Sequence, residues 1–401
     1  MEAPLKSRRG APSSRLDADR SFDIAETLFG DFPSARETWL ALERSADFYP
    51  FQSYAWLETW FGTIGAAHGW SPAILLLERA DGKGRALLPL GIARRTGLRR
   101  LSWLGEGVSD YSGALIAPAG SFSAAELLAA IRGLAARKGC QIIDLDRNPA
   151  YFPSAANPLV GEGFRLLHYK AHSTAVPDDM EGFLADRFTS KERYNLRRAA
   201  KRLEAAGRLR FAVAGDEAGR ANLTDRMIAL KRERYRAIGA VDNFADPSFA
   251  EFYRAAARRS DLGVHISALY LDETAIALHW GLRADPIMYY LMPAFAAGAY
   301  ERYSPGAVFL REFIVQCGRE GLERLDFTIG DEEYKGKWRD RSMDLFRFRE
   351  GRGGRGEVLV AFASAVDWLR SSSFRAPLVR FRAAWRRKRR GGAEGKPVKQ
   401  G

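Results

Sequence analysis

Residues 303–338 read YSPGAVFLREFIVQCGREGLERLDFTIGDEEYKGKW, and this stretch decides the fold of the second half of the chain. A Ser-Pro-Gly turn precedes an amphipathic helical pattern, a short apolar strand pattern follows, and a polar Gly-Asp loop ends in Tyr-Lys. Just upstream, residues 288–292 (MYYLM) are typical of a buried strand. The order predicts a βαβ-like unit. The turn at Ser304 and Gly306 then opens a helix, where free N–H groups favour an anion.

The composition is that of a globular chain. Its 401 residues are 46% hydrophobic and 12% aromatic, and this length corresponds to roughly two to three domains. No apolar run approaches the ~18 residues of a membrane span, and no signal peptide pattern opens the sequence. We therefore expect a cytoplasmic protein. Cys140 and Cys317 each lie in an apolar periodic segment, so neither a disulfide framework nor a cysteine metal site is predicted.

The net charge of +13 is concentrated at the two ends of the chain. Residues 375–401 hold ten Lys and Arg against one Glu, and residues 1–15 hold four basic residues against one acidic residue. The body between them is left with a charge of +1. The basic ends can contact anionic lipid or nucleic acid, or they can be solvated tails.

Each half of the chain shows the same order of helices, antiparallel meander, helix and return strand. The first half has a helical pattern at 50–65, a hairpin at 73–78 and 85–93, a helix at 124–137 and a strand at 141–145. The second half has helices at 183–206, 223–238 and 247–260, and strands at 264–271, 274–282 and 287–292. This order indicates a structural repeat.

The predicted fold class is therefore α/β (α+β), with two modules that each hold a mixed, mainly antiparallel sheet flanked by helices. Residues 1–20 form a basic N-terminal tail without periodicity, 21–160 the first module, 161–350 the second, and 351–401 C-terminal helices with a basic tail. Residues 376–390 within that tail have the pattern of a basic amphipathic helix, which favours peripheral contact with a membrane.

Two motifs resemble a known family. PFQSYAWLETW at 50–60, together with YSPG…LREFI…GLERLDFTIGDEEYKGKW at 303–338, resembles the two-module GNAT-type acyltransferases of the CelD and BioF2-like group, which are distantly similar to Fem aminoacyl transferases. The resemblance covers roughly residues 51–348. It implies that acyl-CoA or acetyl-CoA binds beside the meander as co-substrate.

The resemblance also implies a position for the CoA pyrophosphate, at the turn formed by Tyr303, Ser304, Gly306 and Ala307. Here the sequence departs from the common pattern Gln/Arg-x-x-Gly-x-Gly/Ala, because YSPG offers a single glycine. The predicted anion site at the helix N-terminus is the same position as this implied phosphate site.

Acyl transfer to an amine needs a base, donors for the thioester oxyanion and an acid for the thiolate. Asp326 and Asp331 lie at or just after a strand end, where a base can sit, although polar residues there also cap loops. Strand alternation places Asp326 and Thr328 on one face. Tyr334 and Lys335 are candidates for the acid or for a phosphate partner; the alternative is an exposed Lys beside a packed Tyr.

His279 lies in the alternating strand pattern AIALHWGL, with Trp280 on the opposite face. It is a candidate base, and the alternative is a hydrogen-bonded core histidine. The other four histidines lack metal-ligand spacing, so no metal is predicted.

The second module also contains a strongly basic helical pattern. Residues 187–210 hold nine basic and two acidic residues, and Arg193, Arg197 and Arg198 on this pattern are candidate substrate-binding residues, as is Trp338. They can hold CoA phosphates, an acidic acceptor or, by the Fem resemblance, a tRNA acceptor stem. A solvated helix face is the alternative.

We therefore expect an acyltransferase whose second module is catalytic and whose first module is degenerate or completes the cleft. It would move an acyl group from CoA to an amine or hydroxyl of a cell-envelope or polysaccharide-related acceptor. A tRNA-dependent aminoacyl transferase of Fem type and a non-catalytic accessory protein of polysaccharide biosynthesis are the alternatives.

Overall fold

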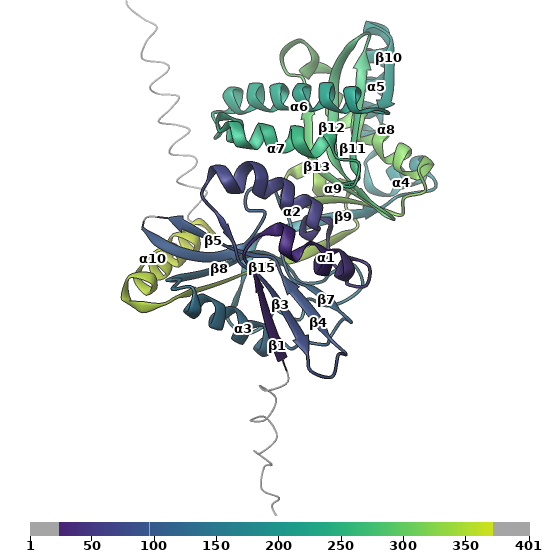
Figure 1. The fold of residues 1–401 in the computed structure, drawn as a ribbon. Coiled ribbons are helices and arrows are strands. Elements are labelled where there is room, and N and C mark those ends of the chain that lie inside the picture. Colours follow the sequence, from purple (N-terminus) through teal and green to yellow (C-terminus); the bar gives the residue numbers. More distant parts are fainter. Residues whose placement is uncertain (1–23, 96, 372–401) are drawn as a thin grey trace, which may run out of the picture.

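The computed structural model describes residues 24–95 and 97–371, and its frame is an 11-stranded mixed sheet (Figure 1). In spatial order the strands are β10 (Leu209–Val213), β11 (Val264–Leu271), β12 (Thr274–Ala284), β13 (Ile287–Phe295), β14 (Arg324–Ile329), β9 (Phe164–Ala175), β15 (Arg341–Gly351), β8 (Ile142–Pro149), β6 (Leu98–Trp103), β5 (Leu90–Arg95) and β2 (Ser71–Pro72). Only β13–β14 and β6–β8 pair in parallel. The predicted fold class, a mainly antiparallel sheet flanked by helices, is confirmed.

Both parallel pairs come from the predicted repeat. Helix α3 (Ala124–Arg137) lies between β6 and β8 in the chain, and helix α8 (Pro305–Arg319) lies between β13 and β14. A helix between two parallel neighbouring strands is the βαβ unit that the stretch at 303–338 predicts. We call residues 24–160 the first module and residues 161–350 the second.

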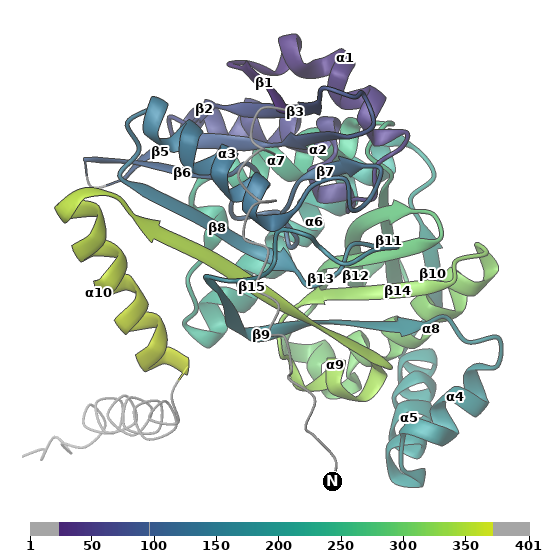
Figure 2. The ribbon, with the colours of Figure 1, turned by 90° about the horizontal axis from the view of Figure 1, so that it is seen from below.

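One strand pairing joins the two modules. β9, at the start of the second module, pairs with β14 and β15 of the same module. β15 in turn pairs with β8 of the first module, with Arg349 opposite Asp144. Figure 2 shows β8, β15 and β9 side by side across the middle of the molecule. The β15–β8 pairing makes one continuous sheet from what the sequence presents as two successive units.

A second, four-stranded sheet belongs to the first module. Its strands are β1 (Ile24–Phe29), β3 (Ile74–Arg79), β4 (Arg85–Leu88) and β7 (Leu115–Ala117). The prediction of one hairpin strand over 85–93 was wrong beyond Leu88. Pro89 has no N–H to donate to a ladder, and the chain passes there from β4 in the small sheet to β5 in the large one.

Helices cover both sheets. The first module has α1 (Phe32–Glu43), η1 (Pro50–Gln52), α2 (Tyr54–Trp60), η2 (Phe61–Gly65) and α3. The second has α4 (Met180–Arg187), α5 (Ser190–Ala206), α6 (Glu217–Ile238), η3 (Asn243–Ala245), α7 (Pro247–Arg258), η4 (Gly298–Tyr303), α8 and α9 (Glu333–Trp338), and α10 (Gly353–Ser371) follows β15.

The helix predicted over residues 183–206 is two helices. Phe188 has an extended backbone, and Thr189 then starts α5 as an N-cap whose hydroxyl accepts from the Glu192 N–H while the Glu192 carboxylate reaches back. This capping box supplies the start signal of a new helix inside an apolar pattern that looks continuous.

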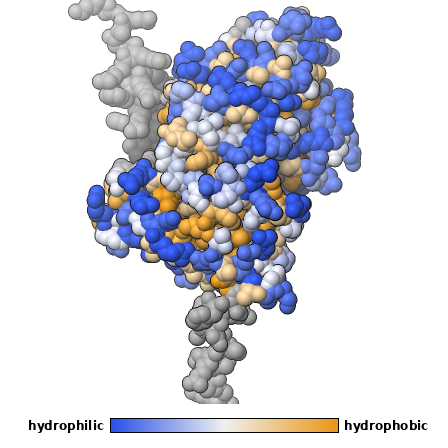
Figure 3. Space-filling view, viewed as in Figure 1, coloured by the Kyte–Doolittle hydropathy of each residue, from blue (hydrophilic) through white to orange (hydrophobic). Residues whose placement is uncertain are grey.

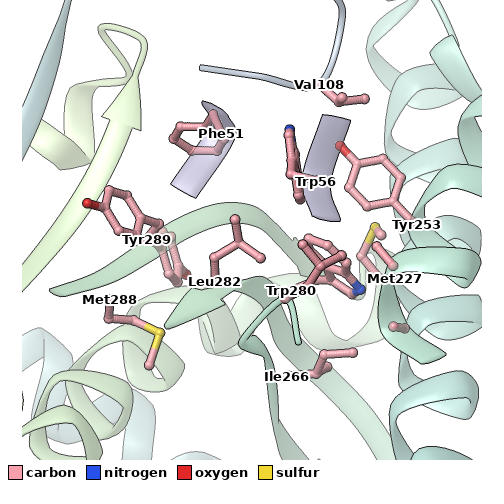
Figure 4. Close-up of a cluster of buried hydrophobic side chains, with 14 of the residues drawn as sticks. Phe51, Trp56, Val108, Met227, Tyr253, Ile266, Trp280, Leu282, Met288 and Tyr289 are labelled. Carbon is pink, nitrogen blue, oxygen red and sulfur yellow. The ribbon is translucent and has the colours of Figure 1, made fainter. Parts of the chain in front are cut away.

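A single hydrophobic core runs through the junction of the modules. Trp56 on α2 packs edge-on against Phe252 on α7, with 4.8 Å between ring centroids, and Phe51 packs against Tyr289 on β13 at 5.7 Å. Figure 4 shows Phe51 and Trp56 pointing at Tyr289, Trp280 and their neighbours. Because these aromatic side chains are buried, the junction is held by apolar contacts as well as by the sheet.

The two faces of the second module's sheet carry different helices. Trp280 on β12 packs against Tyr253 of α7 and donates to Thr224 of α6, whereas its neighbour His279 contacts Phe313 of α8. In the view of Figure 3 this module has a mainly hydrophilic surface, and hydrophobic surface gathers over the first module. Within residues 24–95 and 97–371, no helix is long and apolar enough to cross a membrane.

Gly281 on β12 gives a direct test of this packing. A Cβ at this position would clash with the backbone oxygen of Tyr289 and with the His279 ring. We predict that Gly281→Ala lowers the free energy of unfolding in denaturant by about 1–3 kcal/mol. Gly318→Ala on α8 is the control, because its Cβ would meet Val176 only at van der Waals distance and alanine favours a helix. Equal stability of the two variants would contradict this packing.

Candidate active site

β13 and β14 pair at one end and separate at the other, and we call the gap in strand pairing between them the β13–β14 cleft. They pair only where Ile287–Tyr289 lies beside Arg324–Asp326. Beyond Tyr289, β13 continues along β12 and β14 continues along β9, so the two strands diverge. The edge of β13 that faces the opening has no strand partner among the described residues. Its backbone N–H and C=O groups are therefore available to a ligand.

The N-terminus of α8 lies at the outer end of this cleft. Ser304 has a left-handed backbone (φ 50°), and its side chain caps none of the first amides of α8. Gly306 lies against the Phe295 ring at the end of β13, and Ala307 is exposed. Tyr303, the fourth residue predicted here, is half-buried, and its hydroxyl is 2.7 Å from the Arg302 guanidinium. The turn thus has the predicted geometry of an open helix N-terminus.

The corresponding helix of the first module has a closed N-terminus. Ser123 caps α3, and the Glu126 carboxylate accepts from both the backbone N–H and the hydroxyl of Ser123 at 2.8 Å. Arg79 donates to the same carboxylate at 2.9 Å. The anion position at the start of α3 is thus filled by the protein's own carboxylate, whereas that of α8 is not.

Cationic side chains of α6 and α9 lie near the end of β13 and the loop after β14. Arg234 on α6 stacks over Phe295, with its guanidinium carbon 4.9 Å from the ring centroid. Burial lowers the pKa of Lys231 on α6 to about 8, against the opposing effect of the Glu332 carboxylate. Lys335 on α9 donates to the Ile329 carbonyl at 2.7 Å and pairs with Glu332 at 2.9 Å. Lys335 therefore holds the loop after β14, and Lys231 faces that loop.

Asp326 lies at the base of the cleft, where β13 and β14 separate. Only 8% of this residue is exposed. Its carboxylate accepts from the Tyr111 hydroxyl at 2.9 and 3.1 Å and from the Thr328 N–H at 2.7 Å. Burial raises the pKa of Asp326 to about 6, although these hydrogen bonds act in the opposite direction. A carboxyl with this pKa can exchange a proton near neutral pH.

Thr328 does not continue the alternation that the sequence predicts. Its backbone is left-handed (φ 57°), and the ladder between β14 and β9 shifts register between Asp326 and Thr328. The bulge turns the Thr328 N–H onto the Asp326 carboxylate, so the two residues meet through a local kink and not through the pleat.

The first module contributes charged residues to the same place. Arg147 donates to the Ser109 carbonyl at 2.6 Å and lies 3.5 Å from the Asp110 carboxylate. Burial raises the pKa of Asp110, while Arg147 and the Thr328 hydroxyl act to lower it. Asp110 therefore lies beside the residue that kinks β14. We call Asp110, Tyr111, Arg147, Asp326 and Thr328 the junction cluster.

A large groove opens on the other side of the Tyr111–Asp326 hydrogen bond. It encloses about 1070 Å³ between the modules. Its lining includes Tyr49, the exposed Tyr151, Arg341 of β15, and both partners of that hydrogen bond. The junction cluster thus separates the cleft from a groove wide enough for a sizeable acceptor.

His279 belongs to the core and not to the cleft. It is completely buried, it is 3.2 Å from the Tyr289 carbonyl, and its ring stacks on Tyr290 with 4.7 Å between centroids. Burial holds the pKa of His279 well below its usual value. The structure supports the interpretation as a core histidine and does not bring His279 to the junction cluster.

The remaining motif residues divide between the loop and the packing of α9. Asp331 is exposed and lies 3.3 Å from the His172 ring. Tyr334 is half-buried and meets Phe327 edge-on, and burial raises its pKa. Trp338 is buried between Phe183 and Phe188 of the α4 region, so it packs α9 against α4 and does not face the cleft. The buried position of Trp338 does not fit the predicted contact with substrate.

The predicted arginines lie on α5, which contacts η4 and α8. Arg193 donates to the Ala185 and Phe188 carbonyls, so it joins α4 to α5. Arg197 lines a groove between α5 and α8, and Arg198 is exposed. Arg193 therefore has a structural role, whereas Arg197 and Arg198 remain accessible to a ligand.

Sequence reasoning missed Asp110, Tyr111, Arg147 and Lys231. The first two lie in the glycine-rich loop GEGVSDYSG at residues 105–113. An acid and a tyrosine next to glycines between two strands were the available signal. Nothing in the sequence pairs Tyr111 with Asp326, which lies 215 positions away.

Comparison with known proteins places the second module in a described family. Residues 190–336 match the model of an acetyltransferase (GNAT) domain. The protein is an acyltransferase. The match spans α5 to α9 and therefore includes the β13–β14 cleft and the N-terminus of α8. No curated protein matches the chain.

Solved structures are similar to most of this chain. A conserved protein of unknown function from Bacteroides thetaiotaomicron has 11% identity and a TM-score of 0.50, over 80% of this chain and 99% of that one. FemX has 14% identity and a TM-score of 0.50, over 80% and 96%. The C-terminal domain of a putative lysylphosphatidylglycerol synthetase from Agrobacterium fabrum has 8% identity and a TM-score of 0.49, over 84% and 97%. At these identities the first two show the fold alone.

The described residues contain no group of three or more His, Cys, Asp or Glu arranged to hold a metal ion.

Asp326→Asn tests the environment of the junction cluster. Burial raises the pKa of the folded Asp326 carboxyl to about 6, whereas the pKa of an unfolded aspartate is near 3.8. Its ionisation thus opposes folding, and stability is lost as the pH rises through this window. We predict that Asp326→Asn reduces the fall in unfolding free energy between pH 4 and 7 by roughly 2–3 kcal/mol, measured in denaturant.

Asp186→Asn is the control, because its side chain is exposed on α4. It should keep the pH dependence of the unchanged protein. If Asp326→Asn also keeps it, the assigned burial of Asp326 is wrong.

Proposed function

We propose that the second module transfers an acyl group from acyl-CoA to an amine or hydroxyl in the β13–β14 cleft. One observation carries this proposal: the cleft joins the open N-terminus of α8 to the buried Asp326. A phosphate-bearing thioester needs an anion site at one end and a proton-transfer group at the other. Within the described residues, these two features coincide at this cleft.

The donor would lie along the unpaired edge of β13. Amides of the first α8 turn, with Arg234 on α6, would hold the pyrophosphate. β13 N–H groups beyond Tyr289 would then be placed to donate to the thioester carbonyl as it gains negative charge. One glycine is enough at this turn, because Gly306 is the residue that lies against the Phe295 ring, where a side chain would be crowded.

Asp326 would act as the base. Its carboxylate takes the proton of the attacking amine, the nitrogen bonds to the acyl carbon, and the carbon–sulfur bond breaks. Tyr111 would orient that carboxylate through its hydroxyl. Lys231, whose pKa of about 8 keeps it mainly protonated at neutral pH, would return a proton to the thiolate. Lys335 would hold the loop, and Asp331 and Tyr334 would stay outside the chemistry.

The first module would complete the site without binding a donor itself. Its own parallel pair also covers three residues, Arg100–Ser102 beside Ile142–Asp144. Past that point Trp103 donates to the Asn148 side chain at 3.0 Å across the gap. The protein's own side chains thus bridge this gap, and Glu126 fills the helix terminus.

The acceptor would be a cell-envelope or polysaccharide-related molecule, as in the CelD and BioF2-like group that the motifs resemble. The groove of about 1070 Å³ would receive it, since Asp326 and Tyr111 line both the groove and the cleft. Aromatic and charged side chains around the groove suit a polar acceptor with apolar faces.

A second candidate is aminoacyl transfer from tRNA, as in Fem enzymes. The exposed Arg198 and the groove-lining Arg197 on α5 lie next to η4 and α8, so a polyanion could follow α5 toward the cleft. Steep weakening of charged-tRNA binding with added salt, lost in an Arg197→Gln/Arg198→Gln variant, would favour it.

Ala307→Glu tests the donor site. A carboxylate in the first turn of α8 would repel a pyrophosphate there, while it also suits the helix dipole and should not unfold the protein. We predict that the affinity for acetyl-CoA or CoA, measured by calorimetry, falls at least about tenfold.

The matched control is Ala218→Glu, the same change at an exposed position in the first turn of α6. It should bind CoA as the unchanged protein does. If the unchanged protein binds no CoA species, or if both variants bind equally well, the proposed donor site is wrong.

A further inference from the structure

Helix α10 exposes an apolar stripe to solvent. Val358 is 68% exposed, Leu359 38% and Phe362 67%. Ala361 and Ala365 are also exposed, so positions 358, 361, 362 and 365 follow one face of the helix at helical spacing. A surface helix normally turns its charged residues outward. We call Val358, Leu359, Ala361, Phe362 and Ala365 the α10 stripe.

The stripe is not the result of a loosely placed helix. Asp367 on α10 pairs with Arg349 of β15 at 3.0 Å, and Arg349 lies 3.6 Å from the buried Asp144. At the other end, Gly356 is buried against the Gln141 backbone, where a Cβ would clash with the carbonyl oxygen. Polar contacts and a close backbone approach therefore fix the inner side of α10 and leave the apolar stripe outside.

The sequence that follows α10 is basic. Residues 375–401 hold ten Lys and Arg against one Glu. The predicted amphipathic pattern at 376–390 lies outside the described residues, and its apolar positions are Leu378, Phe381 and Trp385. An apolar stripe joined to a strongly basic segment matches the surface of an anionic bilayer, which offers an apolar layer beneath negative headgroups.

We propose that the α10 stripe, together with the basic segment after it, docks the protein on an anionic membrane surface. The stripe would enter the headgroup layer and the basic residues would pair with lipid phosphates. α10 lies on the outer side of the first module in both ribbon views, away from α6, α7 and α8 (Figures 1 and 2). Docking would therefore leave the β13–β14 cleft open.

The proposal is independent of the reaction, since it concerns neither the donor nor the junction cluster. An anionic membrane is the partner that we assign to the α10 stripe. A second copy of the chain would also cover the apolar surface, but the positive charges next to the stripe on the two copies would repel each other.

Vesicle co-sedimentation of the full chain tests it. Vesicles of phosphatidylcholine and phosphatidylglycerol in equal parts should bind the protein, and vesicles of phosphatidylcholine alone should bind it far less. Added salt should weaken the binding. Val358→Ser/Phe362→Ser should reduce binding at least about tenfold. The variant Arg386→Gln/Arg387→Gln/Lys388→Gln/Arg389→Gln should lose the preference for phosphatidylglycerol.

The matched control is Ile238→Ser/Val241→Ser, which removes two exposed apolar side chains from the second module (57% and 83% exposed). It should bind vesicles as the unchanged protein does. Unchanged vesicle binding by the stripe variant would overturn the proposal. So would a dimer, seen by light scattering without vesicles, that the stripe variant converts to monomer.

Discussion

The pairing of β15 with β8 is the constraint on which the rest of the structure depends. β15 also pairs with β9 of its own module, so the two βαβ units share one sheet. The loop that carries Asp110 and Tyr111 is thereby brought under the point where β13 and β14 separate. The Tyr111 hydroxyl can bond to Asp326 only because the sheet fixes that approach. The site is thus a property of both modules, although the family match covers residues 190–336 of the second.

The modules use the same framework in opposite ways. Both have a parallel strand pair that separates after three residues and a helix that begins nearby. In the first module a carboxylate occupies the helix terminus and a tryptophan bridges the strand gap. In the second, the terminus has no side-chain cap and the gap contains a buried acid. Local side-chain chemistry decides which copy of a repeat can hold a ligand.

Much of the fold and part of the site could be predicted from the sequence. Periodicity located the meanders and the βαβ unit at residues 303–338, and the resemblance led to Asp326 and to the start of α8. Three features escaped. Pro89 divides one apolar run between two sheets, a bulge at Thr328 replaces simple alternation, and Tyr111 meets Asp326 across 215 positions. The first two depend on backbone geometry and the third on tertiary contact, which local patterns do not record.

The central claim is that the cleft of the second module, and not that of the first, receives the acyl donor. Hydrogen exchange of the full chain, followed by mass spectrometry with and without acetyl-CoA, tests it most directly, because amides that contact a ligand exchange more slowly. We predict protection in β13 beyond Tyr289 and in the first turn of α8, and no change at the start of α3. Protection at the start of α3 and along β6, with β13 and α8 unchanged, would contradict the account.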